Sequence, residues 1–451
     1  SLRLEYNDRY PTGFFGLRRA FGTHGAYGPW LMSKALLVVI NGTAFVHGGL
    51  SPLVAELGLA GVNAELKSQV RDYVVQTELL TENGILDPTE NFYRHAEVLE
   101  ALPEDLERPD DISYAIDTVI RLNDASIHSP GSPLWYRGSV GCGALIEEHK
   151  MATALAAIDA DRVVIGHTPT LTRRVLERMD GRVIEIDTGM LNAAYQGSGH
   201  ALIIEGETMT VVGEQDASAS APIPHPRRVG LRPEALSADD IQQILANGEL
   251  TPTSAPDAEK MIVNVKYSGE SVSAVFEEKP RGKGVYPDLA AYRLDRLLGL
   301  DMVPVTVARA IDGENGSLQF VPDGMQNDQE RIANQKGASA WCPLTEQWEA
   351  MYVFDSLIYN EGRRQENILY SIDNWQLILA GHLDSFSTKR GLPPYVASME
   401  SQTGKELQLN AGWRKALSAL TDDYLKEQLG DVLDKRRIKA LGRRRDDLLN
   451  R

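Results

Sequence analysis

The sequence has few cysteines, no long apolar run and no excess of positive charge, and each shortage excludes a class of protein. Its two cysteines, Cys142 and Cys342, lie far apart and lack metal-ligand spacing, so they support neither a disulfide framework nor a thiolate zinc site. No apolar run reaches the length of a membrane span. The formal net charge of −17 argues against nucleic-acid binding, because a phosphate backbone requires a basic face.

No signal peptide is recognisable at the start of the given residues. The chain begins with Ser1, without a methionine or a signal peptide, in the middle of what reads as folded sequence. We therefore expect a cytoplasmic protein of bacterial type from which part of the N-terminus is missing. The negative net charge does not exclude an acidic ligand, because a local metal ion or arginine can determine the charge of a small site.

Length and local patterns predict two domains. A chain of 451 residues exceeds one ordinary core, and its content of 43% hydrophobic and 24% charged residues is typical of a globular protein. Residues 1–213 alternate between strand and helix patterns. Residues 214–230 are rich in Ala, Ser and Pro without periodicity, which predicts a linker. Residues 231–451 form the second domain.

Turn residues between short apolar runs predict the strands. Asn41-Gly42 joins 36–40 to 43–47, and Gly206-Glu207 joins two later runs, both patterns typical of hairpins. A helix is expected to begin after a cap at Ser237. The fold class predicted from these patterns is α/β and α+β. Further expected elements are strands at 162–166, 182–186, 261–267 and 271–276 and helices near 288–299 and 345–359.

Two histidines follow strand patterns directly. The stretch TAFVHGGLSP, residues 43–52, places His47 at the end of an alternating strand and before two glycines, which allow a sharp bend and a close approach. The stretch RVVIGHTPT places His167 in a similar setting. Two such imidazoles can converge on a metal ion, and neutral imidazole suits Zn, Mn or Fe. The alternative is a capped strand end with an incidental histidine. His24 follows no strand and is expected to be structural or exposed.

An arginine and an aspartate accompany these histidines. SPLWYRG places Arg137 after an aromatic pair and before a glycine, so that its guanidinium can project from a packed base. The planar fork of arginine matches a phosphate bidentately. RVIEIDTGM places Asp187 at another strand end, before a glycine.

In this order HGGLSP, PLWYRG, GHTP and DTGM resemble the C-terminal half of a calcineurin-like metallophosphoesterase of the phosphoprotein-phosphatase type. The opening stretch PTGFFGLRRAFGTHGAYGPWL is similar to the same family. The resemblance implies a two-sheet sandwich with two divalent metal ions, Mn, Fe or Zn, that activate a water toward a phosphomonoester or phosphoprotein. It implies that His47 and His167 are metal ligands, that Arg137 binds the substrate phosphate, and that Asp187 supports the metals from a second layer.

The sequence departs from this family in a decisive way. The Asp-x-His, Gly-Asp…Asp-Arg-Gly and Gly-Asn-His-Glu motifs of the N-terminal half occur nowhere in the 451 residues. Two imidazoles cannot hold a dinuclear site without the carboxylates and the asparagine. Half a sandwich would also leave an apolar sheet face uncovered. We therefore expect little or no phosphatase activity from this chain, with truncation as the favoured cause and an evolved half-domain as the alternative.

The second domain carries a weaker pattern. In VFDSLIYNEGRRQENILY, residues 353–370, positions 362 and 367 have the spacing of a kinase-like catalytic loop, in which an aspartate precedes a metal-binding asparagine by five residues. The segment resembles the atypical kinase-like fold shared by HipA-like, phosphoinositide-kinase-like and Golgi secretory-pathway kinases, over roughly residues 231–400. Residues with a role by this resemblance are Lys279, Asn360, Arg363, Asn367 and Asp384.

The kinase-like pattern is degenerate. Gly362 stands where the catalytic aspartate belongs, and Gly381 where the second magnesium ligand is expected. Glu277 occupies the lysine position, with Lys279 two residues on, and Asp288 stands where a glutamate would pair with that lysine. Phosphoryl transfer should fail without the base and the main magnesium ligand. We expect a pseudokinase-like module, against an active kinase with displaced residues or an unrelated α+β domain.

Taken together, the patterns predict a two-domain, phosphatase-type hydrolase that is inactive because it lacks the N-terminal metal-binding motifs. The alternative is a non-catalytic regulatory protein that binds nucleotide at the second domain.

Overall fold

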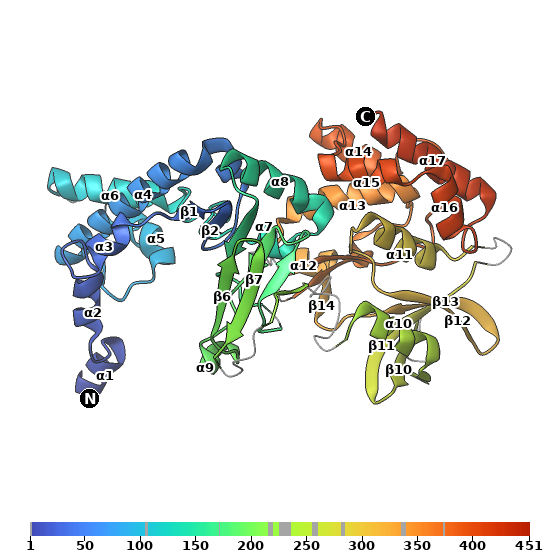
Figure 1. Ribbon diagram of the computed structural model, residues 1–451, viewed down its shortest axis with the longest axis horizontal. Coiled ribbons are helices and arrows are strands. Elements are labelled where there is room, and N and C mark those ends of the chain that lie inside the picture. The colour runs from blue at the N-terminus through green and yellow to red at the C-terminus, as the bar shows by residue number, and fades with distance from the viewer. Residues whose placement is uncertain are drawn as a thin grey trace. The chain divides into compact units, whose positions relative to one another are not determined.

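A computed structural model of the chain describes residues 2–103, 107–170, 172–214, 220–224, 236–254, 260–280, 285–334, 340–372 and 375–451 (Figure 1). The chain divides into two compact units. Unit 1 comprises Ser1–Arg137, Met151–Pro169 and Asp180–Asp187, and unit 2 comprises Gly138–Lys150, Thr170–Met179 and Thr188–Arg451.

These bounds differ from a division into 1–213 and 231–451, because the segments around 138–150, 170–179 and 188–213 belong to unit 2. Most of the expected linker, 215–219 and 225–230, lies outside the described residues. The mixed α/β and α+β class expected from the sequence is confirmed. No helix among the described residues combines the length and the apolar character that a membrane crossing requires.

Unit 1 contains a small mixed sheet. Its strands are β1 (Leu37–Ile40), β2 (Thr43–Val46), β3 (Arg162–Ile165) and β5 (Val183–Glu185). The predicted hairpin is confirmed: β1 and β2 pair antiparallel, with Ile40 opposite Thr43. The turn residues Asn41 and Gly42 both have positive φ, as the tight turn of a two-residue hairpin requires. Strands β2, β3 and β5 run parallel, so their carboxyl ends meet at one edge.

Helices supply most of the remainder of unit 1. A core of buried side chains, with Leu80, Leu99 and Val119 among them, holds three of these helices together. The described helices are α1 (Leu2–Arg9), α2 (Phe14–Phe21), α3 (Gly28–Ser33), α4 (Pro52–Glu82), η1 (Phe92–Arg94), α5 (His95–Glu100) and α6 (Asp110–Asn123), and α8 (Ala144–Ala157) crosses the boundary between the units.

The expectation of an uncovered apolar sheet face is wrong for the central strands. Val163, Val164 and Ile165 of β3 are consecutive and all buried, so both faces of this strand are covered. Exposed apolar side chains lie instead on α2 and α3. Among them, Leu17 is 61% and Trp30 57% exposed.

Unit 2 is built on antiparallel strands. A five-stranded sheet has the order β12-β13-β11-β10-β9, and a three-stranded sheet has the order β14-β15-β16. The strands expected at 261–267 and 271–276 are present, and they pair antiparallel as β10 and β11 with Tyr267 opposite Glu270. The strands of the two sheets are β9 (Glu249–Pro252), β10 (Met261–Tyr267), β11 (Glu270–Glu278), β12 (Thr306–Ile311), β13 (Glu314–Phe320), β14 (Met325–Asn327), β15 (Ile368–Ser371) and β16 (Leu377–Leu379).

Smaller strand pairs and many helices complete unit 2. The predicted hairpin around Gly206-Glu207 forms β6 (His200–Glu205) and β7 (Thr208–Gly213), and β4 (Leu176–Arg178) pairs with β8 (Ile223–Pro224). The expected cap at Ser237 is confirmed, since its hydroxyl accepts from the amide of Asp240. The helices are α7 (Gly138–Gly141), α9 (Asn192–Tyr195), α10 (Ala238–Asn247), α11 (Pro287–Leu298), α12 (Asp328–Ala333), α13 (Leu344–Ile358), η2 (Gln365–Asn367), α14 (Pro394–Thr403), α15 (Ala411–Ala419), α16 (Asp422–Leu429) and α17 (Lys435–Leu449).

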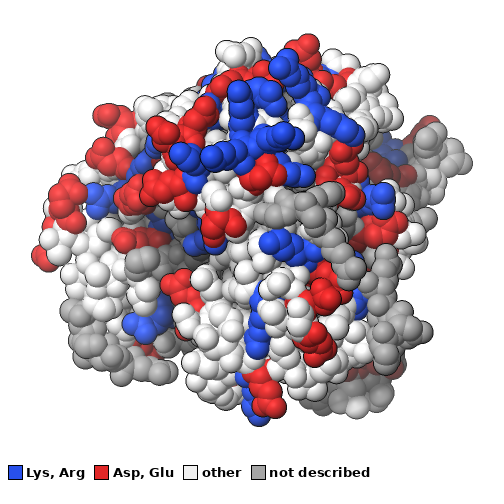
Figure 2. Space-filling view, turned by 90° about the vertical axis from the view of Figure 1, so that its right-hand side faces the viewer, with Lys and Arg blue, Asp and Glu red and all other residues white. Residues whose placement is uncertain are grey.

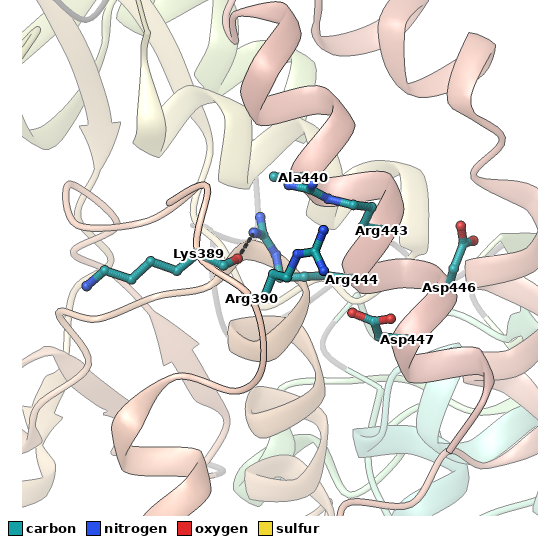
Figure 3. Close-up of a pocket in the computed structure, with 7 residues that line it drawn as sticks. All are labelled: Lys389, Arg390, Ala440, Arg443, Arg444, Asp446 and Asp447. Atoms are coloured by element: carbon teal, nitrogen blue, oxygen red, sulfur yellow. Dashed lines mark hydrogen bonds between the residues drawn. The ribbon is translucent and has the colours of Figure 1, made fainter.

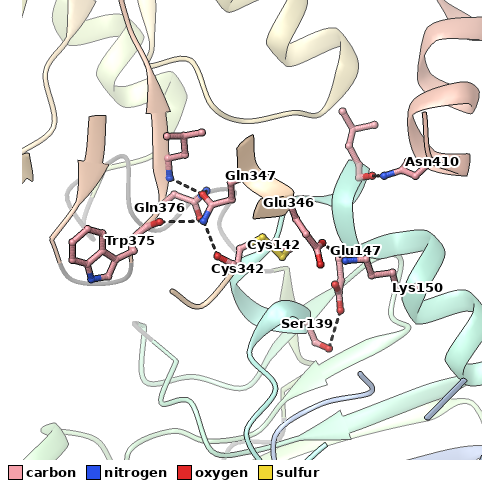
Figure 4. The surroundings of a disulfide bond; sticks show 12 residues. Ser139, Cys142, Glu147, Lys150, Cys342, Glu346, Gln347, Trp375, Gln376 and Asn410 are labelled. Atoms are coloured by element: carbon pink, nitrogen blue, oxygen red, sulfur yellow. Dashed lines mark hydrogen bonds and ion pairs between the residues drawn. A yellow bond between two sulfur atoms is a disulfide. The ribbon is translucent and has the colours of Figure 1, made fainter. Parts of the chain in front are cut away.

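The two cysteines form a disulfide, which corrects the inference from their spacing that no disulfide is supported. Cys142 and Cys342 are 200 residues apart in the chain but only 4.7 Å apart at their Cα atoms, and both are buried (Figure 4). Gly141 permits this approach, because a Cβ there would lie 2.4 Å from the Cβ of Trp341. The bond therefore ties the 138–150 segment to the start of α13.

Polar contacts reinforce the same junction. Lys150 and Glu346 form an ion pair, and the buried Gln347 donates from Nε2 to the carbonyl of Cys342 at 2.7 Å (Figure 4). The Oε1 atom of Gln347 accepts from the amide of Leu377 at 2.6 Å. Because every one of these residues belongs to unit 2, the junction stabilises that unit internally.

Candidate functional site

Two parallel strands of unit 1 place the predicted histidines side by side. Val46 pairs with Ile165, so His47 and His167 both emerge just beyond the carboxyl ends of β2 and β3. The amide of Gly166 donates to the carbonyl of His47 at 2.9 Å. The Nδ1 atom of His167 lies 3.0 Å from Nε2 of His47, a hydrogen-bond distance. The sequence-based pairing of these two residues thus corresponds to direct contact.

The glycines after His47 have a packing role. The amides of Gly48 and Gly49 both donate to the carbonyl of Pro133, at 2.9 and 3.1 Å. A Cβ at position 48 would lie 2.8 Å from the carbonyl carbon and oxygen of Leu134, too close for any side chain. Glycine is therefore required at 48 for the histidine-bearing strand end to contact the 132–138 segment.

That segment brings an aromatic ring and a guanidinium to the histidines. The ring of Trp135 packs edge-on against His167, with centroids 5.3 Å apart, and its Nε1 donates to the carbonyl of Ile127 at 2.6 Å. The positive charge of Arg137 acts on His167 and disfavours its protonation. Arg137 is itself half-buried, and this burial lowers its pKa. Trp135 was not singled out in the sequence, although it belongs to the predicted motif.

His167 is held in its neutral form. Burial lowers its pKa to about 4, and the charges of Arg137 and His47 act in the same direction, whereas Asp187 opposes them. The backbone of His167 is left-handed, with φ of 66°, a conformation that histidine adopts more readily than most residues but that is still uncommon. Its Nε2 atom is buried and has no hydrogen-bond partner among the described residues. The described residues therefore leave the hydrogen-bonding capacity of this nitrogen unused.

The donor set does not fit the two metal ions that the resemblance implies. No group of three or more His, Cys, Asp or Glu side chains lies close enough to hold a metal ion in the part of the chain that the structure describes. His47 and His167 bond to each other, which uses one nitrogen of each ring. Asp187 lies just past β5 and acts on His167 through its charge. These residues therefore do not form a dinuclear centre, and no step through metal ions is derived from them.

In unit 2 the predicted kinase-like loop is organised around a buried ion pair. Arg363 and Asp355 form a bidentate pair, with Nε to Oδ2 at 2.7 Å and Nη2 to Oδ1 at 3.0 Å, and both side chains are about 1% exposed or less. Burial opposes the charge of Arg363, but Asp355 outweighs it and raises its pKa. Nη1 of Arg363 donates to the carbonyls of Asn367 and Ala380 at 3.1 and 2.7 Å. Arg363 thus connects α13, the loop and the end of β16.

The side chains of the two predicted asparagines form hydrogen bonds with the backbone of the loop itself. Asn367 donates from Nδ2 to the carbonyl of Gly362 at 2.7 Å and accepts at Oδ1 from the amide of Arg364 at 2.9 Å. Asn360 accepts from the amide of Gly362 at 2.9 Å and donates to Asp355 at 3.3 Å. Both side chains thus hold the loop backbone, and each amide oxygen already accepts one backbone N–H.

Gly362 and Gly381 occupy the two positions where the kinase-like pattern expects an aspartate. A Cβ at position 362 would lie 3.2 Å from Oδ2 of Asp384, so Asp384 occupies the space beside the expected base. A Cβ at position 381 would lie 2.9 Å from Nδ2 of Asn367, and Gly381 has φ of 69°, which disfavours any other residue. An aspartate at 381 would therefore require a different loop.

The charged residues near the expected lysine position make other pairs. The Nζ atom of Lys279 lies 4.3 Å from the ring centre of Tyr286, a cation–π contact. Glu277 pairs with Lys260 at 2.9 Å. Asp288 accepts at Oδ1 from the amide of His382 at 2.9 Å.

Lys260 and His382 were missed in the sequence. Lys260 immediately precedes β10, next to Met261, which pairs with Phe276, so strand register could have indicated its contact with Glu277. The contact of His382 with Asp288 spans 94 residues and has no local signal.

Comparisons with known proteins give little further information. No protein-family model matches the chain, and no curated protein sequence matches it. Among solved structures, the chain is similar to the crystal structure of the proinflammatory kinase CtkA from Helicobacter pylori, with 13% identity and a TM-score of 0.27. The match covers 46% of this chain and 94% of that chain. It is a weak likeness to a kinase and does not establish a shared fold.

Proposed function

We propose that unit 1 binds the phosphoryl group of a phosphomonoester or phosphoprotein and does not hydrolyse it. The observation that carries this proposal is the buried Nε2 of His167, which has no hydrogen-bond partner among the described residues and lies in the field of the Arg137 charge. When the exposed His47 donates to Nδ1 of His167, the proton of the neutral His167 ring resides on Nε2. Nε2–H and the guanidinium are then two N–H donors for phosphate oxygens.

The absence of hydrolysis follows from the donor set. Attack on phosphorus requires an activated water, and the complete family site activates it with two metal ions. The described residues hold no such group, and the one imidazole nitrogen left free on His167 serves as a donor. The described residues of unit 1 therefore favour recognition of a phosphoryl group over its hydrolysis.

Calorimetric titration of the full chain with phenyl phosphate tests this proposal. Arg137→Gln removes one charge-assisted donor and should weaken binding about tenfold or more. Arg121→Gln, an exposed change of equal charge on α6, serves as the matched control and should leave the affinity unchanged. No saturable binding by the unmodified chain, or equal affinity in Arg137→Gln, would refute the assignment.

A metal-dependent phosphoesterase is the second candidate for unit 1. The contact of His47 with His167 at adjacent parallel strand ends favours it, because the motifs that supply these residues resemble that family. Release of phosphate from phenyl phosphate in the presence of manganese, abolished in His47→Ala, would establish this activity and overturn the non-hydrolytic reading. Absence of release at saturating substrate would support the binding reading.

For unit 2 we propose a pseudokinase-like, regulatory role without phosphoryl transfer. Asn360 and Asn367 are engaged by the loop backbone, and Gly362 offers no carboxylate to accept a hydroxyl proton. Thermal-shift titration with ATP and magnesium measures whether this unit still binds nucleotide. Labelled-phosphate transfer that is lost in Asp384→Ala or Lys279→Ala would instead establish an active kinase with displaced residues.

A further inference from the structure

The C-terminal basic helix contains a buried arginine, one nitrogen of which has no hydrogen-bond partner in the described part of the chain. The stretch from Asp434 to Arg451 holds eight basic and three acidic residues, a pattern that predicts a solvated helix face. That prediction is wrong for Arg444 of α17, which is only 3% exposed. Figure 2 shows Lys and Arg side chains gathered, with acidic ones among them, in the upper part of the face that it presents.

Three backbone carbonyls hold part of the Arg444 guanidinium. Nε donates to the carbonyl of Leu357 at 2.7 Å, and Nη1 donates to the carbonyls of Ser387 and Lys389 at 2.7 and 3.4 Å. Nη2 is buried and has no hydrogen-bond partner among the described residues. A buried donor of a charged group without an acceptor is costly, so a ligand that accepts from it is favoured.

This arginine lines a cavity together with further cationic side chains. The cavity has a volume of about 220 Å³ and is lined by Lys389, Arg390, Ala440, Arg443, Arg444, Asp446 and Asp447 (Figure 3). The Nε atom of Arg443 is also buried without a partner among the described residues. Two unsatisfied guanidinium donors thus line one cavity.

The charges around the cavity favour an anion. The Lys389 side chain extends away from the arginines, and its Nζ pairs with Glu361 at 2.7 Å (Figure 3). Asp446 pairs with Arg445 at 2.7 Å. With these pairs set aside, the guanidinium groups of Arg390, Arg443 and Arg444 share the cavity with one remaining carboxylate, that of Asp447.

We propose that this cavity of unit 2 is a binding site for a small doubly charged oxyanion, inorganic phosphate or the phosphoryl group of a small phosphomonoester. Guanidinium groups match phosphate oxygens in geometry and charge, and the unpartnered Nη2 of Arg444 and Nε of Arg443 supply two donors. The volume lies below the roughly 300–1,000 Å³ of sites for drug-sized ligands, which favours a small anion over a whole nucleotide. This site is separate from the proposed phosphoryl site of unit 1.

Binding of an anion in this cavity should affect the neighbouring 387–390 segment. Arg444 holds the carbonyls of Ser387 and Lys389, which follow Asp384 by a few residues. An anion that fixes the Arg444 guanidinium would therefore stabilise the 387–390 segment next to the kinase-like loop. Protection of these amides from hydrogen exchange should rise when phosphate is added.

Calorimetric titration with inorganic phosphate tests the site in the full chain with Arg137→Gln, so that unit 1 does not contribute. Arg443→Gln should weaken binding about ten- to hundredfold, because it removes a charge-assisted donor whose Nε makes no hydrogen bond to the described residues. Arg436→Gln changes the same charge at an exposed position of α17 and should leave binding unchanged. Arg390→Gln gives a second, independent variant and should also weaken binding.

The outcomes separate this site from the function of unit 1. Saturable binding in the Arg137→Gln chain that Arg443→Gln removes and Arg436→Gln preserves supports the site. No binding in the Arg137→Gln chain, or equal losses in Arg443→Gln and Arg436→Gln, overturns it. Repeating the phenyl phosphate titration of unit 1 in a chain that carries Arg443→Gln removes the contribution of this cavity, so that failure of either site leaves the test of the other intact.

Discussion

Reduction of the Cys142–Cys342 disulfide should destabilise unit 2 substantially. The bond closes a loop of about 200 residues between two buried sulfur atoms. In the chain-entropy model a loop of this length contributes about 5 kcal/mol, whereas measured disulfides typically contribute about 2–4 kcal/mol. We therefore expect the free energy of unfolding of unit 2 to fall by about 3 kcal/mol when the bond is absent.

Urea unfolding followed by tryptophan fluorescence measures this change. Trp341, Trp348, Trp375 and Trp413 lie in unit 2, so the signal reports mainly on that unit. With a slope of about 3 kcal/mol per molar urea, the midpoint should fall by about 1 M on reduction. The double variant Cys142→Ala/Cys342→Ala should unfold near the reduced midpoint and should not respond to reductant.

Two results would refute this reasoning. Thiol labelling of the denatured, unreduced protein that modifies both cysteines would show that the bond does not form. If the cysteines resist labelling before reduction, so that the bond is present, but reduction leaves the midpoint of urea unfolding unchanged, the bond does not restrict the unfolded chain.

Three further predictions follow from the two candidate sites. Arg363→Met leaves Asp355 buried without its ion-pair partner and should cost about 3–5 kcal/mol of stability in urea unfolding, whereas the exposed Arg436→Met should cost little. Gly48→Ala forces a Cβ to 2.8 Å from the Leu134 carbonyl and should weaken phenyl phosphate binding in calorimetry, while Gly131→Ala, with no contact under 3.5 Å, should not. The His167 ring should titrate near pH 4 in NMR, and because the unfolded state binds its proton first, stability should fall as pH drops from about 6.5 toward 4. A ring midpoint near 6.5 would contradict the neutral imidazole.

The sequence predicted best what neighbouring residues determine. Asn41-Gly42 and Gly206-Glu207 specify hairpins by turn geometry, and both are present. His47 and His167 could be paired because each follows a short strand before or after glycine, and parallel strands bring such ends together.

Long-range contacts were the part that local patterns could not provide. The Cys142–Cys342 bond and the contact of Asp288 with His382 join segments 200 and 94 residues apart, and nothing in the neighbouring sequence marks either. The buried state of Arg444 was also missed, because a basic helix reads as solvated until the backbone carbonyls that accept from it are known. Glycine at 362 indicated a missing carboxylate, but only the structure places Asp384 beside it.

The most direct measurement is phosphorus NMR of phenyl phosphate with the full chain in the presence of zinc and magnesium. Non-hydrolytic recognition in unit 1 requires that the ester resonance shift or broaden with added protein, and that the effect decline in Arg137→Gln. No resonance of inorganic phosphate should grow over time. Growth of inorganic phosphate that His47→Ala abolishes would contradict this account, and so would an ester resonance that the protein leaves unchanged.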